Sequence, residues 1–108
     1  MKRGNVVLVR MPNSPASKAR PCLVVQRDST LDDPLKVTVC PLTTTLRGIT
    51  SRRPFVAPSS ENGLDAPSEV QIDWVYTFEV VRIGAIIGMV DVATMREVDT
   101  ALRRWLDL

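Results

Sequence analysis

Four polar side chains stand where the sequence could bring them to one substrate. Arg20 opens the apolar run "PCLVVQR", and Thr43 follows the apolar run "KVTVCPL". Gln71 and Asp73 stand two residues apart in the alternating segment "EVQIDWVYTF". Residues two apart share one face of a β-strand, so the sequence predicts that Gln71 and Asp73 point the same way. The neighbouring ends of two strands in a small barrel would also let Arg20 and Thr43 face one pocket.

The residue types that are missing narrow the chemistry. The chain has no histidine, which excludes histidine triads and histidine-ligated metals. It has no Gly-rich phosphate loop, and its carboxylates are not spaced as in a glycosidase or a two-metal nuclease. Arginine, threonine, serine, glutamine and aspartate are left. This set suits an anionic substrate that supplies its own nucleophile.

RNA is such a substrate, because its 2′-hydroxyl lies beside the scissile phosphate. The protein then has to orient that hydroxyl, balance the charge on the phosphorane and protonate the 5′-oxygen. An arginine is always cationic and can bind two phosphate oxygens at once. Such a reaction requires no metal, and we expect neither a metal nor an organic cofactor.

Each of these features also has a purely structural interpretation. An arginine before a strand is often a solvated loop residue, and a threonine run after a strand often forms a turn. An aspartate within a strand is often exposed or makes a structural hydrogen bond. The residue pattern alone leaves this choice open.

Short apolar runs between turn signals predict a mainly β protein. Pro21 fits the first position of the second strand, and Asn62-Gly63 is the strongest turn signal. Gly84 or Gly88 is expected to mark a bend or bulge in the last strand. The expected strands cover residues 6–9, 21–27, 36–42, 54–59, 69–78 and 80–90.

The last segment changes its period and predicts an amphipathic helix capped by Asp91. Its apolar face would consist of Met95, Val98, Ala101, Leu102 and Trp105. Strands followed by one helix predict a small curled antiparallel sheet, or SH3-like barrel, plugged by the C-terminal helix. At 108 residues, the chain is expected to be a single domain spanning residues 1–108.

Charge and cysteine usage indicate the partner and the compartment. Residues 1–53 contain ten Lys/Arg and three Asp/Glu, a net charge of +7, whereas residues 54–108 contain four and nine, a net charge of −5. The basic half suggests an anionic partner. Cys22 and Cys40 lie in apolar runs and are expected to be reduced core thiols, although a disulfide stays open.

The N-terminal apolar run is too short for a signal peptide, and no run approaches the roughly 18 residues that span a bilayer. We therefore expect a cytoplasmic protein without membrane contact.

Read in order, these blocks resemble the MazF/PemK/Kid family of toxins from bacterial type II toxin–antitoxin systems. The opening "RGNVVLVRMPNSPASKARPCLVVQRD" is similar to the start of that family. "VCPLTTTLRG", "GLDAPSEVQIDWVYT" and "IGMVDVATMREVDTALRRWLDL" resemble its later blocks. The resemblance covers nearly the whole chain.

The resemblance implies a metal-independent endoribonuclease on an SH3-like barrel. Such a toxin cuts single-stranded RNA, including mRNA, at short sequences and leaves 2′,3′-cyclic phosphate and 5′-hydroxyl ends. It also implies a homodimer inhibited by a cognate antitoxin that covers the RNA-binding groove.

The resemblance also assigns roles to residues. Arg20 is expected to stabilise the phosphorane and is a candidate general acid, while Thr43 is expected to hold a phosphate oxygen or the 2′-hydroxyl. Asp73 matches the aspartate of an Arg-x-Asp acid–base pair in the Kid branch of the family and is expected to be catalytic. Gln71 replaces the arginine of that pair, which shifts weight to Arg20 and Thr43. The expected RNA-binding residues are Lys18, Thr44, Arg47, Gln71, Trp74 and Tyr76.

Two other functions stay open on the sequence. A CcdB-like toxin shares the fold and inhibits DNA gyrase by binding through its C-terminal helix, and Trp105 lies near that end. Alternatively, Gln71 marks a catalytically degenerate homologue that only binds RNA or antitoxin.

Overall fold

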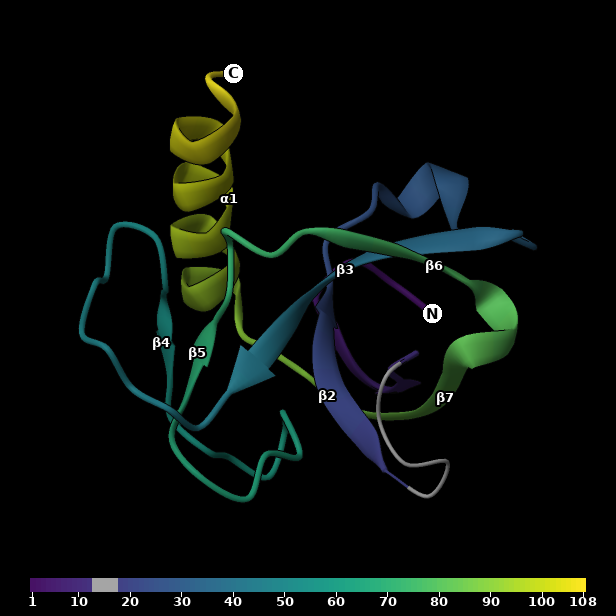
Figure 1. Cartoon of the computed structure of the whole chain (residues 1–108), viewed down its shortest axis with the longest axis horizontal. Coiled ribbons are helices and arrows are strands. Elements are labelled where there is room, and N and C mark those ends of the chain that lie inside the picture. The colour runs from purple at the N-terminus through teal and green to yellow at the C-terminus, as the bar shows by residue number, and fades with distance from the viewer. Residues whose placement is uncertain (13–17) are drawn as a thin grey trace.

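Seven antiparallel strands form a curled sheet, with one helix packed against its side (Figure 1). The computed structural model describes residues 1–12 and 18–108. The order in the sheet is β4-β5-β3-β2-β1-β7, and β6 also pairs with β3. In chain order the strands are β1 (Asn5–Arg10), β2 (Ala19–Val24), β3 (Lys36–Thr43), β4 (Phe55–Val56), β5 (Ser68–Val70), β6 (Tyr76–Glu79) and β7 (Ile83–Met89). The predicted mainly β fold with a C-terminal helix is confirmed.

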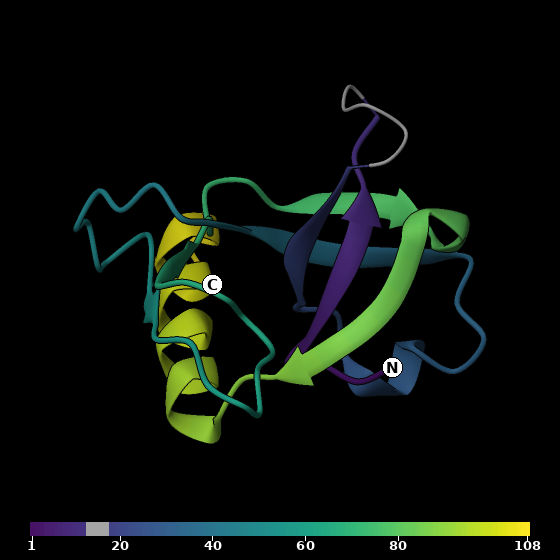
Figure 2. The same cartoon turned by 90° about the horizontal axis from the view of Figure 1, so that it is seen from below.

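The long strand β3 is the reason why the sheet curls. Its first half pairs with β6, and its end pairs with β5. On its other edge, Val39 to Pro41 pair with β2. Strand β3 therefore joins two parts of the sheet that run in different directions. Figure 2 shows β6 running alongside β3, whereas β2, β1 and β7 cross that direction.

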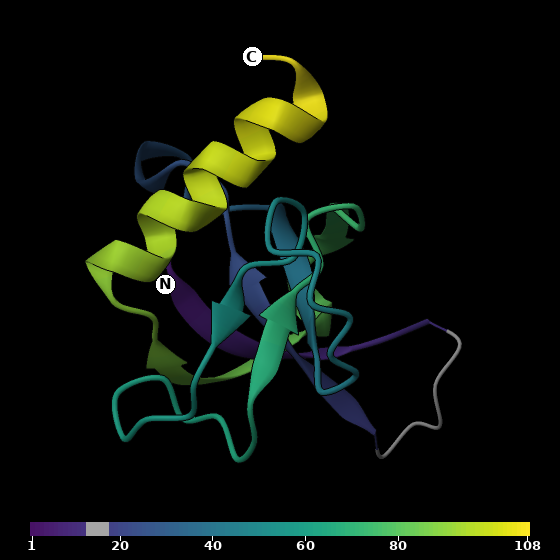
Figure 3. The same ribbon diagram turned by 90° about the vertical axis from the view of Figure 1, so that its left-hand side faces the viewer.

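Two hydrophobic cores lie on opposite faces of this sheet. Along β1, Val6 contributes to the core beneath the helix, whereas Val7 and Val9 contribute to the core inside the curl. All three are fully buried, which confirms that β1 is a central strand with two apolar faces. Figure 3 shows the helix running obliquely beside β4 and β5, and Val98 and Ala101 of the helix share the first core with Val56 and Val70 of these strands.

The C-terminal helix α1 (Val92–Leu106) follows its predicted pattern. Asp91 caps it, because its carboxylate accepts the backbone N–H of Thr94 at 2.7 Å. Val98 and Ala101 are buried, but Trp105 is 46% exposed. The predicted apolar face is therefore covered along the first turns and uncovered at the end.

The predicted continuous strand over 69–78 is wrong. Leu42 faces Val70, and an unbroken ladder would then bring Val39 opposite Asp73, but Val39 faces Tyr76 instead. Residues 71–75 leave the sheet as a turn, which we call the 71–75 turn, and the register beyond it is shifted by three residues. Its cause lies in Pro41 on the facing strand, which has no N–H to continue the ladder. Gln71 and Asp73 consequently do not share a strand face.

Three smaller differences concern where the predicted strands begin and end. β2 begins at Ala19, so Pro21 lies within the strand; its missing N–H costs little because β3 pairs only from Cys22 onward. The predicted fourth strand shrinks to Phe55–Val56 at the sheet edge. Residues 80–82 form a 3-10 turn before β7. The expected bulge is confirmed by register shifts between β1 and β7.

Candidate active site

Strand β3 pairs with β2 along one edge and with β6 along the other (Figure 1). Residues from these three strands line a cleft of about 630 Å³. The lining comes from four stretches of the chain, and five of its residues were expected to bind or cleave a substrate. The lining residues are Met11, Pro12, Arg20, Pro41, Leu42, Thr43, Gln71, Trp74, Tyr76, Thr77 and Phe78. The expectation that Arg20 and Thr43 face one pocket is thus confirmed.

Arg20 is placed in the cleft by strand pairing. It is the second residue of β2 and lies opposite Val9 of β1. Its side chain is exposed, and within residues 1–12 and 18–108 it has no ion-pair partner. Among the described residues that line the cleft there is no carboxylate, so the guanidinium is free to bind an anion.

Thr43 contributes a hydroxyl with an available proton. It is the half-buried last residue of β3 and lies opposite Glu69 of β5. Its Oγ1 accepts the backbone N–H of Thr45 at 3.1 Å. Because this bond uses only the acceptor side of the hydroxyl, its proton can be donated to an oxygen in the cleft.

Aromatic rings form one wall of the cleft. Trp74 and Tyr76 meet edge to face with ring centroids 5.9 Å apart, and Tyr76 lies 5.5 Å from Phe78. Trp74 is 51% exposed and Tyr76 is 40% exposed. The two outer rings therefore present open surfaces on which a base could stack, whereas Phe78 belongs to the core.

The 71–75 turn brings Gln71 into this cleft and Asp73 out of it. The backbone N–H of Gln71 donates to the Pro41 carbonyl at 2.9 Å, which fixes the turn against β3. Asp73 instead lines a smaller hollow with Arg53. Gln71 and Asp73 were expected to share one strand face. Because this segment forms a turn instead, their side chains line different hollows.

Asp73 forms a two-point ion pair with Arg53. Nε and Nη2 of Arg53 donate to the two carboxylate oxygens, each at 3.2 Å. Partial burial raises the pKa of Asp73, but the Arg53 hydrogen bonds outweigh it and hold that pKa below its ordinary value. Arg53 was not among the sequence candidates, because twenty residues separate the partners and no motif links them.

Three expected RNA-binding residues lie outside the cleft lining. Lys18, Thr44 and Arg47 are all exposed. The sequence also predicts that the loops at 11–19 and 44–53 determine the cleavage specificity, and residues 13–17 of the first loop lie outside the part of the chain that the structure describes. Lys18 and Thr44 directly flank the strands that carry Arg20 and Thr43.

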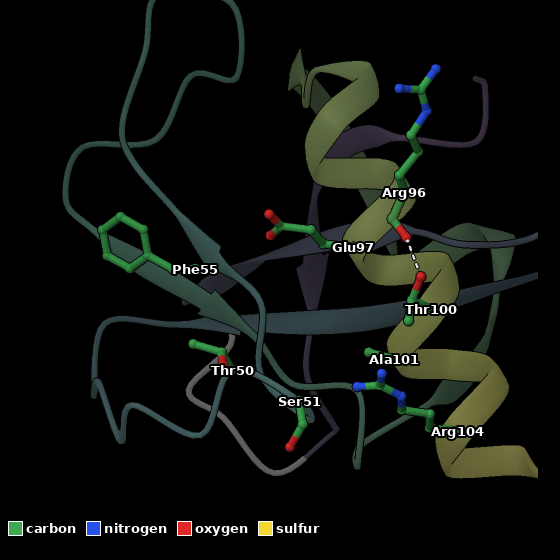
Figure 4. Close-up of a pocket in the computed structure, with 8 residues that line it drawn as sticks. All are labelled: Thr50, Ser51, Phe55, Arg96, Glu97, Thr100, Ala101 and Arg104. Carbon is green, nitrogen blue, oxygen red and sulfur yellow. Dashed lines mark hydrogen bonds between the residues drawn. The ribbon is translucent and has the colours of Figure 1, made fainter.

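A second hollow of about 590 Å³ lies between α1 and the chain around β4. Figure 4 shows Glu97 and Arg104 extending from α1 toward the side of Phe55 and Ser51. Arg96 and Arg104 line this hollow together with Glu97, and none of the expected catalytic residues lines it. The cleft containing Arg20 is therefore the better candidate for phosphate chemistry.

Within residues 1–12 and 18–108, no three His, Cys, Asp or Glu side chains gather as metal ligands. Over the same residues, no helix is both long enough and apolar enough to cross a membrane.

Comparisons with known proteins show the family and agree with the fold. Residues 2–106 match the family described as PemK-like, MazF-like toxin of type II toxin-antitoxin system. Endoribonuclease MazF3 of Mycobacterium tuberculosis is 41% identical over 71 residues, which are 66% of this chain and 66% of that protein. The matched part is thus just under two thirds of the curated relative's length.

Solved structures extend the likeness over the whole chain. The Mycobacterium tuberculosis toxin MazF-mt6 is 30% identical with a TM-score of 0.81, covering 96% of this chain and 97% of that one. A mycobacterial endoribonuclease in complex with its cognate antitoxin is 29% identical with a TM-score of 0.80, covering 100% and 96%. The family match favours the MazF/PemK resemblance over the CcdB-like alternative. This chain belongs to the PemK-like, MazF-like toxins of type II toxin–antitoxin systems.

Proposed function

We propose that this toxin is an endoribonuclease that cuts single-stranded RNA in the cleft between β2, β3 and β6. The observation that carries the proposal is that Arg20 and Thr43 line the same cleft, whose described lining residues include no carboxylate. The matched relative from Mycobacterium tuberculosis is itself named an endoribonuclease. Such a cleft binds a phosphodiester and can stabilise additional negative charge on it.

The reaction uses the nucleophile of the substrate. The ribose 2′-oxygen attacks the adjacent phosphorus, the bond from phosphorus to the 5′-oxygen breaks, and a 2′,3′-cyclic phosphate and a 5′-hydroxyl result. The 2′-proton passes to solvent, and the departing 5′-oxygen takes a proton from water. Arg20 stabilises the phosphorane through two N–H groups, and Thr43 donates its hydroxyl proton to a phosphate oxygen.

The residues around this centre hold the strand of RNA. Trp74 and Tyr76 stack on bases, and the amide of Gln71 reads a base edge. Lys18, Thr44 and Arg47 contact the RNA strand on either side of the cleft. Specificity for short sequences follows, because stacked and hydrogen-bonded bases must fit beside the scissile phosphate.

Asp73 acts through Arg53 in this scheme. It lies outside the cleft lining, and its ion pair joins the 71–75 turn to the chain before β4. We assign it the role of a positioning residue that keeps Gln71 and Trp74 in the cleft. Its expected catalytic role is thereby reduced to support of the residues that touch RNA.

The expected partners are a cognate antitoxin and a second copy of the chain. A related mycobacterial endoribonuclease is known in complex with its cognate antitoxin, and an acidic antitoxin segment would complement the basic cleft of this chain. For the homodimer, β7 offers an apolar strand at one edge of the sheet that is exposed at most of its positions.

The proposed activity is tested with purified toxin, mixed-sequence single-stranded RNA and EDTA. Wild-type protein should give discrete fragments with 2′,3′-cyclic phosphate ends. Arg20→Ala should lower kcat by about 100- to 1000-fold, as expected when one donor to a transition-state oxyanion is lost. Arg27→Ala is the matched control, since Arg27 is exposed and lies beyond the opposite end of β2.

The alternatives predict different results in the same experiment. RNA that is bound but left intact by the wild-type toxin would indicate a catalytically degenerate homologue. Intact RNA together with inhibition of DNA gyrase would indicate a CcdB-like mechanism. Equal cleavage by Arg20→Ala and wild type would remove the active site from this cleft.

A further inference from the structure

The loop between β3 and β4, residues 44–54, concentrates positive charge in an ordered backbone. We call it the basic loop, because it contains Arg47, Arg52 and Arg53 and no acidic residue. Its beginning is held by Glu69 of β5, whose carboxylate accepts the backbone N–H groups of Arg47 and Gly48 at 3.1 and 3.0 Å. Glu69 is only 3% exposed, so this anchor is built into the core side of the loop.

The middle and the end of the basic loop are fixed as well. The Ile49 carbonyl accepts the backbone N–H groups of Arg52 and Arg53 at 3.1 and 2.8 Å. The side chain of Arg53 then binds Asp73. These bonds therefore fix the backbone of the basic loop and the side chain of Arg53 before any ligand arrives, which lowers the entropy that a ligand would have to overcome.

These arginines surround a hollow of about 210 Å³ beside the cleft. It is lined by Arg47, Ile49, Arg52, Arg53 and Asp73. Asp73 compensates Arg53, and the carboxylate of Glu69 lies buried behind the loop. Within residues 1–12 and 18–108, the guanidinium groups of Arg47 and Arg52 have no ion-pair partner. The open side of the hollow thus presents excess positive charge.

The hollow and the cleft are joined by shared structure. The basic loop starts directly after Thr43, which lines the cleft. Asp73 lies in the same 71–75 turn as Gln71 and Trp74, which also line the cleft. A chain of nucleotides leaving the cleft past this turn would meet the hollow.

We propose that this hollow binds a backbone phosphate of the RNA, separate from the phosphate that is cleaved. The inference rests on the proposed function for its substrate. Arg47 and Arg52 bind the phosphate, while Arg53 and Asp73 form the rigid floor of the site. Because the contact is to phosphate, it raises affinity for all sequences and depends on salt.

The test measures binding of a twelve-nucleotide single-stranded DNA of mixed sequence. This probe keeps the phosphates but lacks the 2′-hydroxyl, so binding can be followed without cleavage. Arg52→Ala should raise Kd about fivefold at low salt, in the range of one exposed ion pair. The slope of log K against log salt should fall in magnitude by about 0.7 for each lost phosphate contact. Arg47→Ala should behave in the same way.

Arg27→Ala is the control, because it removes the same charge from an exposed site at the other end of β2. Thermal melting of each variant separates lost binding from lost folding, and Arg52→Gln gives a second variant that removes the charge but keeps a polar side chain. Equal Kd values and salt slopes for wild type, Arg47→Ala and Arg52→Ala would overturn the subsite, as would an equal loss in Arg27→Ala.

The same measurement distinguishes failure of the subsite from failure of the proposed function. If the wild-type toxin never cleaves RNA but Arg52→Ala still weakens DNA binding selectively, the endoribonuclease proposal fails and the phosphate site stands. If RNA is cleaved and Arg52→Ala changes neither DNA binding nor the KM for long RNA, the phosphate site fails and the activity stands.

Discussion

Cys22 and Cys40 lie on adjacent paired strands, but their thiols enter different cores. Cys22 faces Pro41 and joins the core inside the curl, whereas Cys40 faces Leu23 and joins the core beneath the helix. Both are free and fully buried, which confirms the expected core thiols. Burial raises the pKa of each thiol from 9.0 to about 12.

This burial predicts unreactive thiols in the native toxin. At pH 8, iodoacetamide should label neither cysteine in the folded protein and both in guanidinium chloride, because the thiolate is the reactive form. The free energy of unfolding should also fall as pH rises from 9.0 toward 12, since unfolded thiols lose their protons first. Cys22→Ala with Cys40→Ala should lack that component and still cleave RNA. Rapid native labelling, detected by mass spectrometry, would contradict buried thiols.

Single residues were predictable from sequence where their neighbours in the chain determine their place. Arg20 and Thr43 stand next to apolar runs that predict strands, and both residues line the cleft. Arg53 could not be found in this way, because its partner Asp73 is reached only through the fold. Ion pairs across loops depend on tertiary placement, for which one sequence carries no periodic signal.

At the scale of elements, periodic patterns located the strands and the helix, while interruptions were harder to see. The segment 69–78 alternates like one strand, and its split into β5 and β6 depends on Pro41 in another strand. The helix was predictable to its N-cap, because capping and amphipathic spacing are local properties. Pairing partners decide where a strand stops, and they are not local.

Gly88 of β7 is an element-level feature with a measurable consequence. A Cβ at this position would lie 2.3 Å from the carbonyl carbon of Asn62 and 2.4 Å from the Glu61 carbonyl oxygen. The backbone of the 57–64 loop therefore packs directly on β7, and Met89 donates its N–H to Glu61 at 2.8 Å. Only a glycine allows this approach.

We expect Gly88→Ala to lower the free energy of unfolding by about 1–3 kcal/mol, the range for overpacked sites. Urea denaturation gives this value. Gly48→Ala is the control, because a Cβ there meets no atom within 4 Å and only its positive φ of 74° opposes the change. If Gly48→Ala lowered the free energy of unfolding more than Gly88→Ala, the 57–64 loop would be able to move away from β7 at little cost, and the prediction would be wrong.

At the scale of the whole molecule, the two ends of the sheet differ. At one end, β4 and β5 lie beside α1, whereas at the other end β7 pairs with β1 and, within residues 1–12 and 18–108, with no other strand. β7 reads "IGAIIGM", yet most of its residues are exposed, including Ile86 at 51% and Met89 at 39%. Val81, just before the strand, is 71% exposed. The 57–64 loop covers the end of β7 at Gly88 and Met89, but the rest of this apolar edge strand is uncovered, which favours association with a second chain.

The proposed homodimer should therefore depend on the β7 edge. Ile86→Glu should shift the wild-type dimer to a monomer in sedimentation velocity, because a carboxylate buried in the interface would lack a partner. Leu35→Glu is the matched control: Leu35 is 85% exposed and lies just before β3, so this variant should stay dimeric. A wild-type protein that sediments as a monomer at high concentration would refute the dimer, and an Ile86→Glu dimer would move the interface away from β7. Cleavage by the Ile86→Glu monomer would further show that the cleft of one chain, with Arg20 and Thr43, is sufficient for catalysis.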